Sequence, residues 1–310
     1  MKIQLACIAL LAGTAAHASP FTTSDGDTKV NFIYTSTTGT DLIRSNGDVD
    51  NKGNVGVADG GPGGPKPSWS GNGFEILHQA YTFQAMHGLS SNTDVKFSLT
   101  YKQVENQGKI WPNEEMSKEG KYDDWSDFSV GVNHMFYGTD SLFASFSATY
   151  NGPAADYNPN VLITPGIESP EFVLGLSGAW VDQGLGVMAG LDVNQALRYG
   201  RAYDQTRTRV YLNYFGLDMV SFGLWYGMVS TGGDAIDIFS ADWGTLELGD
   251  EGNVGGPFAR LDEAFNYYGV SVSSAFGQYD VTFAYNAKLL DGAKNTDLNT
   301  GMSLAVGYSL

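Results

Sequence analysis

The chain has 310 residues, a formal net charge of −17 and a single cysteine. Its acidity excludes a nucleic-acid binder held by phosphate contacts. After the N-terminal region no stretch approaches the length of about eighteen apolar residues that a transmembrane helix needs. The 40 glycines and 13% aromatic residues, against only 16% charged residues, argue against an ordinary soluble domain.

The N-terminal residues have the pattern of a secretory signal peptide. Lys2 supplies a positive charge, residues 3–16 form an apolar core too short to span a bilayer, and the small-residue site Ala-His-Ala ends at Ala18. We therefore expect a signal peptide at 1–18, cleaved after Ala18, and a mature domain at 19–310. The alternative is a retained membrane anchor.

Alternating apolar and polar side chains dominate the mature sequence, in segments of about ten residues. This period of two is typical of strands with one apolar and one polar face. In the first half of the chain, the predicted apolar faces are these: Val30, Phe32 and Tyr34; Tyr81, Phe83 and Ala85; Val95, Phe97, Leu99 and Tyr101; Phe128, Val130, Val132 and Phe136; Leu142, Ala144, Phe146, Ala148 and Tyr150. The first three strands are predicted at about 28–38, 73–86 and 93–103.

The second half of the chain repeats the pattern. Its predicted apolar faces are these: Phe172, Leu174, Leu176 and Trp180; Val187, Ala189, Leu191, Val193 and Leu197; Val210, Leu212 and Tyr214; Val220, Phe222, Leu224, Tyr226 and Met228; Tyr268, Val270, Val272 and Phe276; Val281, Phe283, Tyr285, Ala287 and Leu289; Met302, Leu304, Val306, Tyr308 and Leu310. Tight turns and long loops connect the strands in alternation. The long loops are expected after residue 38 and at 105–124, 151–170, 231–261 and 291–297, with a brief one near residue 200.

Twelve strands, five short turns and six longer loops predict a closed, antiparallel up-and-down barrel in a bacterial outer membrane. Closure satisfies the backbone groups that an open sheet edge would expose to lipid. The alternative is a soluble all-β sandwich or barrel, which would bury the apolar face. Aromatic residues favour the membrane barrel, because they fall at both strand ends as two interfacial girdles. The outer girdle contains Tyr101, Tyr150 and Tyr199, and the periplasmic girdle contains Phe136, Trp180, Tyr214 and Phe276.

If the apolar face meets lipid, the opposite face lines the lumen. Five cations of this parity fall near the predicted outer mouth: Lys102, Arg198, Arg207, Arg209 and Lys288. They would form a basic constriction that attracts anionic or hydroxyl-rich solutes. The alternative is a salt-bridge network, with Asp192, Glu105 or loop carboxylates, that fills the barrel. Unchanged ion selectivity in Arg209→Ala would favour the second interpretation.

Catalysis needs a nucleophile beside a base. The mature histidines are His78, His87 and His134, and no Gly-x-Ser-x-Gly motif accompanies them. No HExxH motif occurs, and the acidic stretches 234–242 and 247–251 lack calcium-loop spacing. We therefore expect no enzyme, no cofactor and no metal; a lipid-acting barrel hydrolase is the alternative.

A structural or surface-binding barrel with a plugged lumen is the other alternative, since a long loop could fold inward or hold a partner. About eight strands give a filled barrel and sixteen or more an open one, so twelve favour a narrow passage. The expected partners are outer-membrane lipid and lipopolysaccharide, the barrel-assembly machinery and a small-molecule solute. The oligomeric state stays open.

Two segments resemble known proteins. DDWSDFSVGVNHMF, at 123–136, resembles segments of a transporter-like family linked to meta-pathway phenol degradation, and GMSLAVGYSL, at 301–310, resembles the insertion-directing last strand of Gram-negative outer-membrane barrels. Such strands usually end in an aromatic residue, whereas this chain ends in Leu310. The resemblance implies an outer-membrane channel for small, often hydrophobic or aromatic compounds. A nucleoside-type channel, also twelve-stranded, is the nearest competitor. We therefore predict a passive channel for small solutes.

Overall fold

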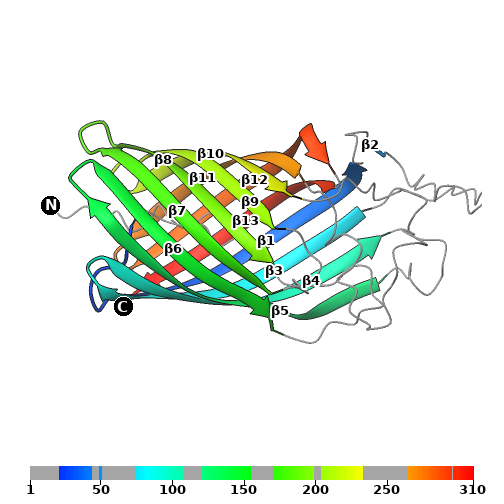
Figure 1. Cartoon of the computed structure of the whole chain (residues 1–310), viewed down its shortest axis with the longest axis horizontal. Helices are drawn as coiled ribbons and strands as arrows, with labels where there is room; N and C mark the ends of the chain where they lie inside the picture. The colour runs from blue at the N-terminus through cyan, green and yellow to red at the C-terminus, as the bar shows by residue number, and fades with distance from the viewer. Residues whose placement is uncertain are drawn as a thin grey trace, which may run out of the picture.

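The structure is a computed structural model that describes residues 21–43, 49–50, 75–107, 120–154, 170–198, 204–232, 264–294 and 296–310. The predicted signal peptide at 1–18 lies outside the described residues. Consecutive strands pair antiparallel, and the last strand pairs with the first, so the sheet closes into a barrel (Figure 1). No helix in the described part is long and apolar enough to cross a membrane.

Twelve long strands form the described barrel. In chain order they are β1 (Thr28–Ile43), β3 (Glu75–Ser90), β4 (Thr93–Gln107), β5 (Gly120–Gly138), β6 (Leu142–Pro153), β7 (Glu171–Asp182), β8 (Val187–Arg198), β9 (Gln205–Tyr214), β10 (Val220–Thr231), β11 (Ala264–Phe276), β12 (Tyr279–Lys294) and β13 (Thr296–Ser309). A two-residue strand, β2 (Val49–Asp50), pairs with the end of β1. The predicted closed antiparallel barrel is confirmed.

Five short connections lie at one end of the barrel, where the first described residue, Phe21, and the C-terminus also lie (Figure 1). One of them is the turn at 276–278, in which Gly277 has a φ of +64° that few other residues adopt. In single-chain outer-membrane barrels the short turns and termini are periplasmic. We therefore call this end periplasmic and the opposite end outer.

Several strands are longer than the alternation predicts. β4 continues to Gln107 and β5 already begins at Gly120, so the predicted loop at 105–124 is wrong at both ends. The predicted loop at 291–297 is wrong as well, because β12 and β13 cover almost all of it. Only the membrane-embedded part of a strand needs an apolar face, whereas the backbone ladder can continue beyond it through polar residues.

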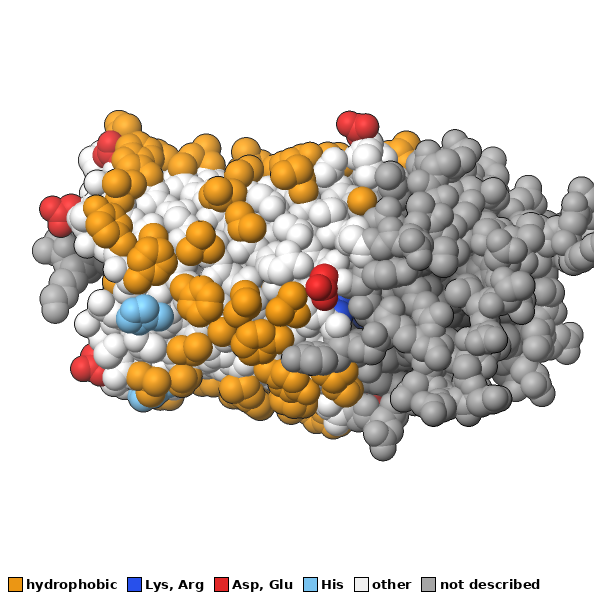
Figure 2. Space-filling model, in the orientation of Figure 1, with side chains coloured by type: hydrophobic (Ala, Val, Ile, Leu, Met, Phe, Trp, Pro, Cys, Tyr) orange, Lys and Arg blue, Asp and Glu red, His pale blue; other side chains and the backbone are white. Residues whose placement is uncertain are grey.

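The apolar faces point outward, as the membrane barrel requires. In β10, Phe222 and Leu224 are 49% and 52% exposed, whereas Trp225 and Val229, of the other parity, are 6% and 8% exposed. Apolar side chains cover much of the visible outer surface (Figure 2). A soluble barrel would bury these side chains, so this alternative is ruled out.

The predicted girdle residues that the structure describes also point outward. Phe136, Trp180, Tyr214 and Phe276 are exposed at the periplasmic ends of their strands. Toward the outer end, rings of neighbouring strands touch: the centroids of Tyr34 and Tyr81 are 5.2 Å apart and those of Tyr101 and Trp125 are 5.6 Å apart. Tyr199 lies outside the described residues.

A paired substitution on β13 tests which face meets lipid. Leu304 is 44% exposed on the outer face, and its neighbour Ser303 faces inward and is half-buried. We expect Leu304→Arg to lower the free energy of unfolding in phospholipid vesicles by about 2–4 kcal/mol, because the charge enters the bilayer core. Ser303→Arg is the matched control and should cost much less. Equal costs in urea titrations would contradict the assignment of the faces.

Candidate functional site in the barrel lumen

Small side chains line much of the lumen on β6, β7 and β13. The following small residues, which alternate with the outward apolar ones, are all buried there: Ser145, Ser147, Thr149, Gly175, Ser177, Ala179 and Gly307. The cross-strand register places Ser145 beside Ser177 and Ser147 beside Gly175. This part of the wall therefore occupies little of the lumen.

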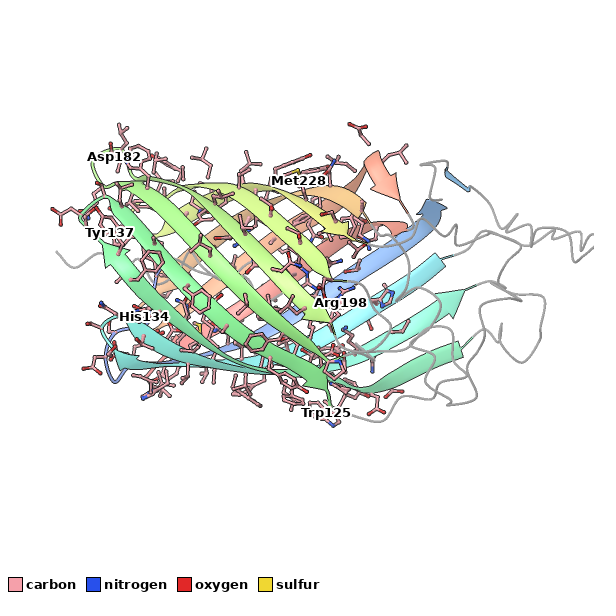
Figure 3. All side chains as sticks on the ribbon, viewed as in Figure 1. Trp125, His134, Tyr137, Asp182, Arg198 and Met228 are labelled. Carbon is pink, nitrogen blue, oxygen red and sulfur yellow. The ribbon has the colours of Figure 1, made fainter. Side chains whose placement is uncertain are left out.

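A buried ion-pair cluster joins β7, β8 and β9. Glu171 is 1% exposed, and its Oε2 lies 3.3 Å from Nε of Arg198 and 3.1 Å from Nη2 of Arg207. Asn151 also donates a hydrogen bond of 2.8 Å to Oε1 of Glu171. Two guanidinium groups therefore share one carboxylate inside the barrel. Arg198 and the periplasmic residue His134 lie toward opposite ends of the barrel (Figure 3).

A second ion pair lies two residues further along β9, closer to the periplasmic end. Asp192 of β8 and Arg209 of β9 are Cα partners, and Arg209 Nε donates to Asp192 Oδ2 over 2.9 Å. Asp192 is fully buried, and Ser177 of β7 donates its hydroxyl to the other carboxylate oxygen. This pairing of a cation with Asp192 is the one that the salt-bridge interpretation predicted.

The two remaining predicted cations lie elsewhere on the wall. Lys102 of β4 pairs with Asp127 of β5 over 3.3 Å. Lys288 of β12 lies over the ring of Phe265 on β11, 4.1 Å from its centroid. The structure therefore brings Arg198, Arg207 and Arg209 together on β8 and β9, and it places Lys102 and Lys288 on separate strands.

Three lumenal aromatic side chains lie against glycines of neighbouring strands. A Cβ added at Gly190, Gly227 or Gly269 would come within 2.1–2.2 Å of a ring atom. The rings are those of Tyr211, Tyr267 and Trp225, respectively. The glycines let these bulky side chains lie flat along the wall. The alternation did not single out this arrangement, although glycine at a lumenal position opposite an aromatic residue would have been its signal.

The N-terminal segment 21–24 occupies the periplasmic mouth, which the sequence did not predict. The ring of Phe21 packs on that of Phe143, with centroids 4.9 Å apart, and contacts a lumenal cluster of Ala179, Val181 and Met188. The backbone oxygen of Phe21 accepts a 3.1 Å hydrogen bond from the lumenal side chain of Asn133.

Further contacts hold this N-terminal segment in place. The backbone N–H of Thr23 donates to Oδ2 of the buried Asp94 over 3.2 Å. A Cβ at Gly88 would lie 2.0 Å from the backbone oxygen of Ser24, so the chain passes directly over this glycine. The segment therefore narrows the lumen at its periplasmic end.

His87 and His134 lie at the periplasmic end of the barrel. The Nδ1 atoms of His87 and His134 are each 2.9 Å from a threonine hydroxyl, that of Thr28 and Thr93 respectively, on the outer face near the periplasmic turns. Within the described ranges, no group of three or more His, Cys, Asp or Glu side chains could hold a metal ion. The acidic stretches at 234–242 and 247–251 lie outside the described residues.

Together, the outward apolar band and the polar lumen define a transmembrane β-barrel of the outer-membrane type. No known protein family matches the chain, and no curated protein matches it in sequence. In fold it is similar to the COG4313 outer membrane channel from Pseudomonas putida F1, with a TM-score of 0.66 and 10% identity over 97% of this chain and 100% of that chain.

A second solved structure, the NanC porin, has a TM-score of 0.49 and 8% identity over 91% of this chain and 100% of that chain. At these identities the comparisons show the fold alone. The resemblance to the phenol-degradation family therefore stays a prediction.

Proposed function

We propose that this protein is a passive channel for small solutes in the outer membrane of a Gram-negative bacterium. The observation that carries the proposal is a polar lumen, containing cations that share a carboxylate, inside a barrel whose outer face is apolar. The fold similarity to an outer membrane channel supports it.

Part of the lumenal wall is open enough to line a passage. Ser98, Ser129 and Ser303 point inward and are only half-buried, in contrast to the closely packed wall around Glu171 and Asp192. An apolar solute would gain nothing from these hydroxyl groups, whereas a polar or charged solute can exchange water for them. The wall therefore favours passage of solutes that carry polar groups.

The arginines near the outer end are the proposed selectivity element. Because Arg198 and Arg207 share Glu171, the cluster has an excess of positive charge, and rings of charge in a narrow pore set ion preference. We expect Arg198→Gln to shift the reversal potential in a KCl gradient toward cation preference, while Arg207 keeps Glu171 paired. Arg198→Lys is the matched control, since it retains the charge. An identical reversal potential in all three proteins would remove this cluster from the selectivity mechanism.

Single-channel recording of the purified protein in planar bilayers tests the proposed function itself. Discrete conductance steps would support a channel, and their absence in folded protein would overturn the proposal. A plugged barrel without transport is the second candidate, because the N-terminal segment 21–24 occupies the periplasmic mouth. Binding of lipopolysaccharide and recognition by the barrel-assembly machinery remain predictions.

A further inference from the structure

One row of the cross-strand register brings cations and an aromatic ring side by side in the lumen. Asp192 pairs with Arg209, Arg209 with Gly227, Gly227 with Tyr267 and Tyr267 with Lys288, from β8 through β12. Neighbouring strands lie about 4.8 Å apart. The ring of Tyr267 on β11 therefore has a cation-bearing strand on each side. Lys288 is on the adjacent strand β12, and Arg209 is two strands away on β9.

The glycine in this row determines where the ring lies. A Cβ at Gly227 would be 2.2 Å from Cζ of Tyr267, so the ring leans across β10 toward the strand of Arg209. Tyr267 is half-buried, and its ring centroid lies 6.1 Å from that of Phe265. Two aromatic rings on β11 therefore form an apolar step in the lumenal wall.

Cations lie near this step on the neighbouring wall. Lys288 Nζ lies 4.1 Å from the centroid of Phe265, and Cζ of Arg209 lies 5.5 Å from the ring centroid of Tyr211. Val229 of β10 is the register partner of both Phe265 on β11 and Arg207 on β9, so these two residues lie two strands apart in the same row. Arg209 itself is paired with Asp192, whereas Arg207 shares its carboxylate with Arg198, so an anion beside Arg207 would not have to displace a one-to-one ion pair.

Beside the row lie buried polar groups that lack a partner. Asn194 is 1% exposed, and neither atom of its amide has a hydrogen-bond partner; Nε1 of Trp225, which is 6% exposed, has none either. Asn194 is the Cα partner of Arg207, and Trp225 lies next to Tyr211 across β9 and β10. Unsatisfied buried groups are uncommon in native structures. These atoms are closed off from the lumen, so they add polarity to the wall but no direct contact for a solute.

We infer that the lumenal row from Arg209 to Lys288 binds a flat, ring-bearing solute that carries a carboxylate. The ring stacks on Tyr267 and Phe265, and the carboxylate accepts hydrogen bonds from the neighbouring lysine or arginine side chains. The inference rests on the proposed function, because it names the class of solute that the channel would select. A solute with only a charged group would contact the cations of the row but not its rings, and a solute with only an aromatic ring would do the reverse.

Three fluorinated probes separate ring from charge in equilibrium binding measured by fluorine NMR on the detergent-solubilised protein. 4-Fluorobenzoate has both features, 4-fluorobenzyl alcohol has only the ring, and 4,4-difluorocyclohexanecarboxylate has only the charge. We expect 4-fluorobenzoate to bind about tenfold more tightly than the alcohol, because it gains charge-assisted hydrogen bonds. It should bind about fivefold more tightly than the cyclohexane acid, because it gains aromatic stacking.

Substitutions of Tyr267 test whether 4-fluorobenzoate binds at this side chain. Tyr267→Leu should lower 4-fluorobenzoate affinity about fivefold, to that of the cyclohexane acid, whereas Tyr267→Phe should retain it. Tyr268→Leu is the matched control, since the next side chain on β11 faces lipid and is 38% exposed. Heat-modifiable gel migration identifies the folded variants.

Equal affinity for the three probes, or 4-fluorobenzoate affinity that Tyr267→Leu leaves unchanged, would overturn the inference. Binding is measured without conduction, so its outcome is separate from that of the single-channel recording. Conductance without selective binding would contradict the inferred solute class and leave the proposed channel function intact. Selective binding without conductance would contradict the channel function and leave the binding site intact.

Discussion

Deleting residues 21–24 is expected to raise the single-channel conductance severalfold. In the folded protein Phe21 packs against Phe143 and is held by the side chain of Asn133, so the segment fills part of the periplasmic mouth. The hydrogen bonds described at 21–23 are each worth about 0.5–1.5 kcal/mol, so the segment can be removed at a modest cost compared with the barrel's backbone ladder. The barrel strands begin only at Thr28, so the deletion leaves the ladder intact.

A point substitution can displace the same segment without shortening the chain. Gly88→Ala places a methyl group 2.0 Å from the backbone oxygen of Ser24, and we expect a conductance similar to that of the deletion. Gly178→Ala is the matched control, because its nearest contact would be an ordinary 3.8 Å. Wild-type conductance in both the deletion and Gly88→Ala would show that the segment does not limit flow.

Glu171→Gln is expected to be the most destabilising single change in the lumen. It leaves the guanidinium groups of Arg198 and Arg207, which are 18% and 10% exposed, without their shared carboxylate. Removing one partner of a buried ion pair costs about 3–5 kcal/mol. The expected result is a loss of this size in the free energy of unfolding, measured by urea titration in phospholipid vesicles.

The pair between Lys102 and Asp127 provides the comparison. These side chains are 20% and 17% exposed, and partly hydrated pairs contribute little, about 0–1 kcal/mol in exposed settings. Asp127→Asn should therefore cost much less than Glu171→Gln. Similar losses for the two variants would mean that burial does not govern these ion pairs.

The barrel could be predicted because alternation is a local signal. Phe97 and Leu99 point outward on β4 as their spacing predicted, and the residues between them point inward. The strand ends could not be predicted in this way. Beyond the membrane, β4 and β5 continue through polar residues, where the apolar period that marks a strand is lost.

The lumenal partners were predicted only in part, because they depend on register between strands. Asp192 lies on a strand with clear alternation, so its inward direction and its availability to a cation followed from the pattern. Glu171 is the first residue of β7, directly after Pro170, at the edge of the predicted loop. Its place between Arg198 and Arg207 follows from the pairing of three strands, which no single segment encodes.

Two other features depend on contacts between residues far apart in the sequence. The segment 21–24 is too short and irregular to show any period. Its place in the mouth depends on Asn133 and Asp94, whose hydrogen-bond partners in the segment are 112 and 71 residues away along the chain. The alternation predicted that Tyr268 faces lipid and therefore that Tyr267 faces inward, but it could not tell which residues of the neighbouring strands lie beside Tyr267. The register places Tyr267 beside Gly227 and Lys288.

If the protein is the proposed channel, solutes pass along the polar face of these strands while the apolar face meets lipid. Cys7, within the predicted signal peptide, is the only cysteine, so single cysteines can be placed at adjacent positions of β5 without other substitutions. A cationic methanethiosulfonate reagent, added during single-channel recording, should lower the current stepwise in Ser129→Cys. It should leave the current unchanged in Val130→Cys. Current reduction in Val130→Cys with none in Ser129→Cys would contradict the account.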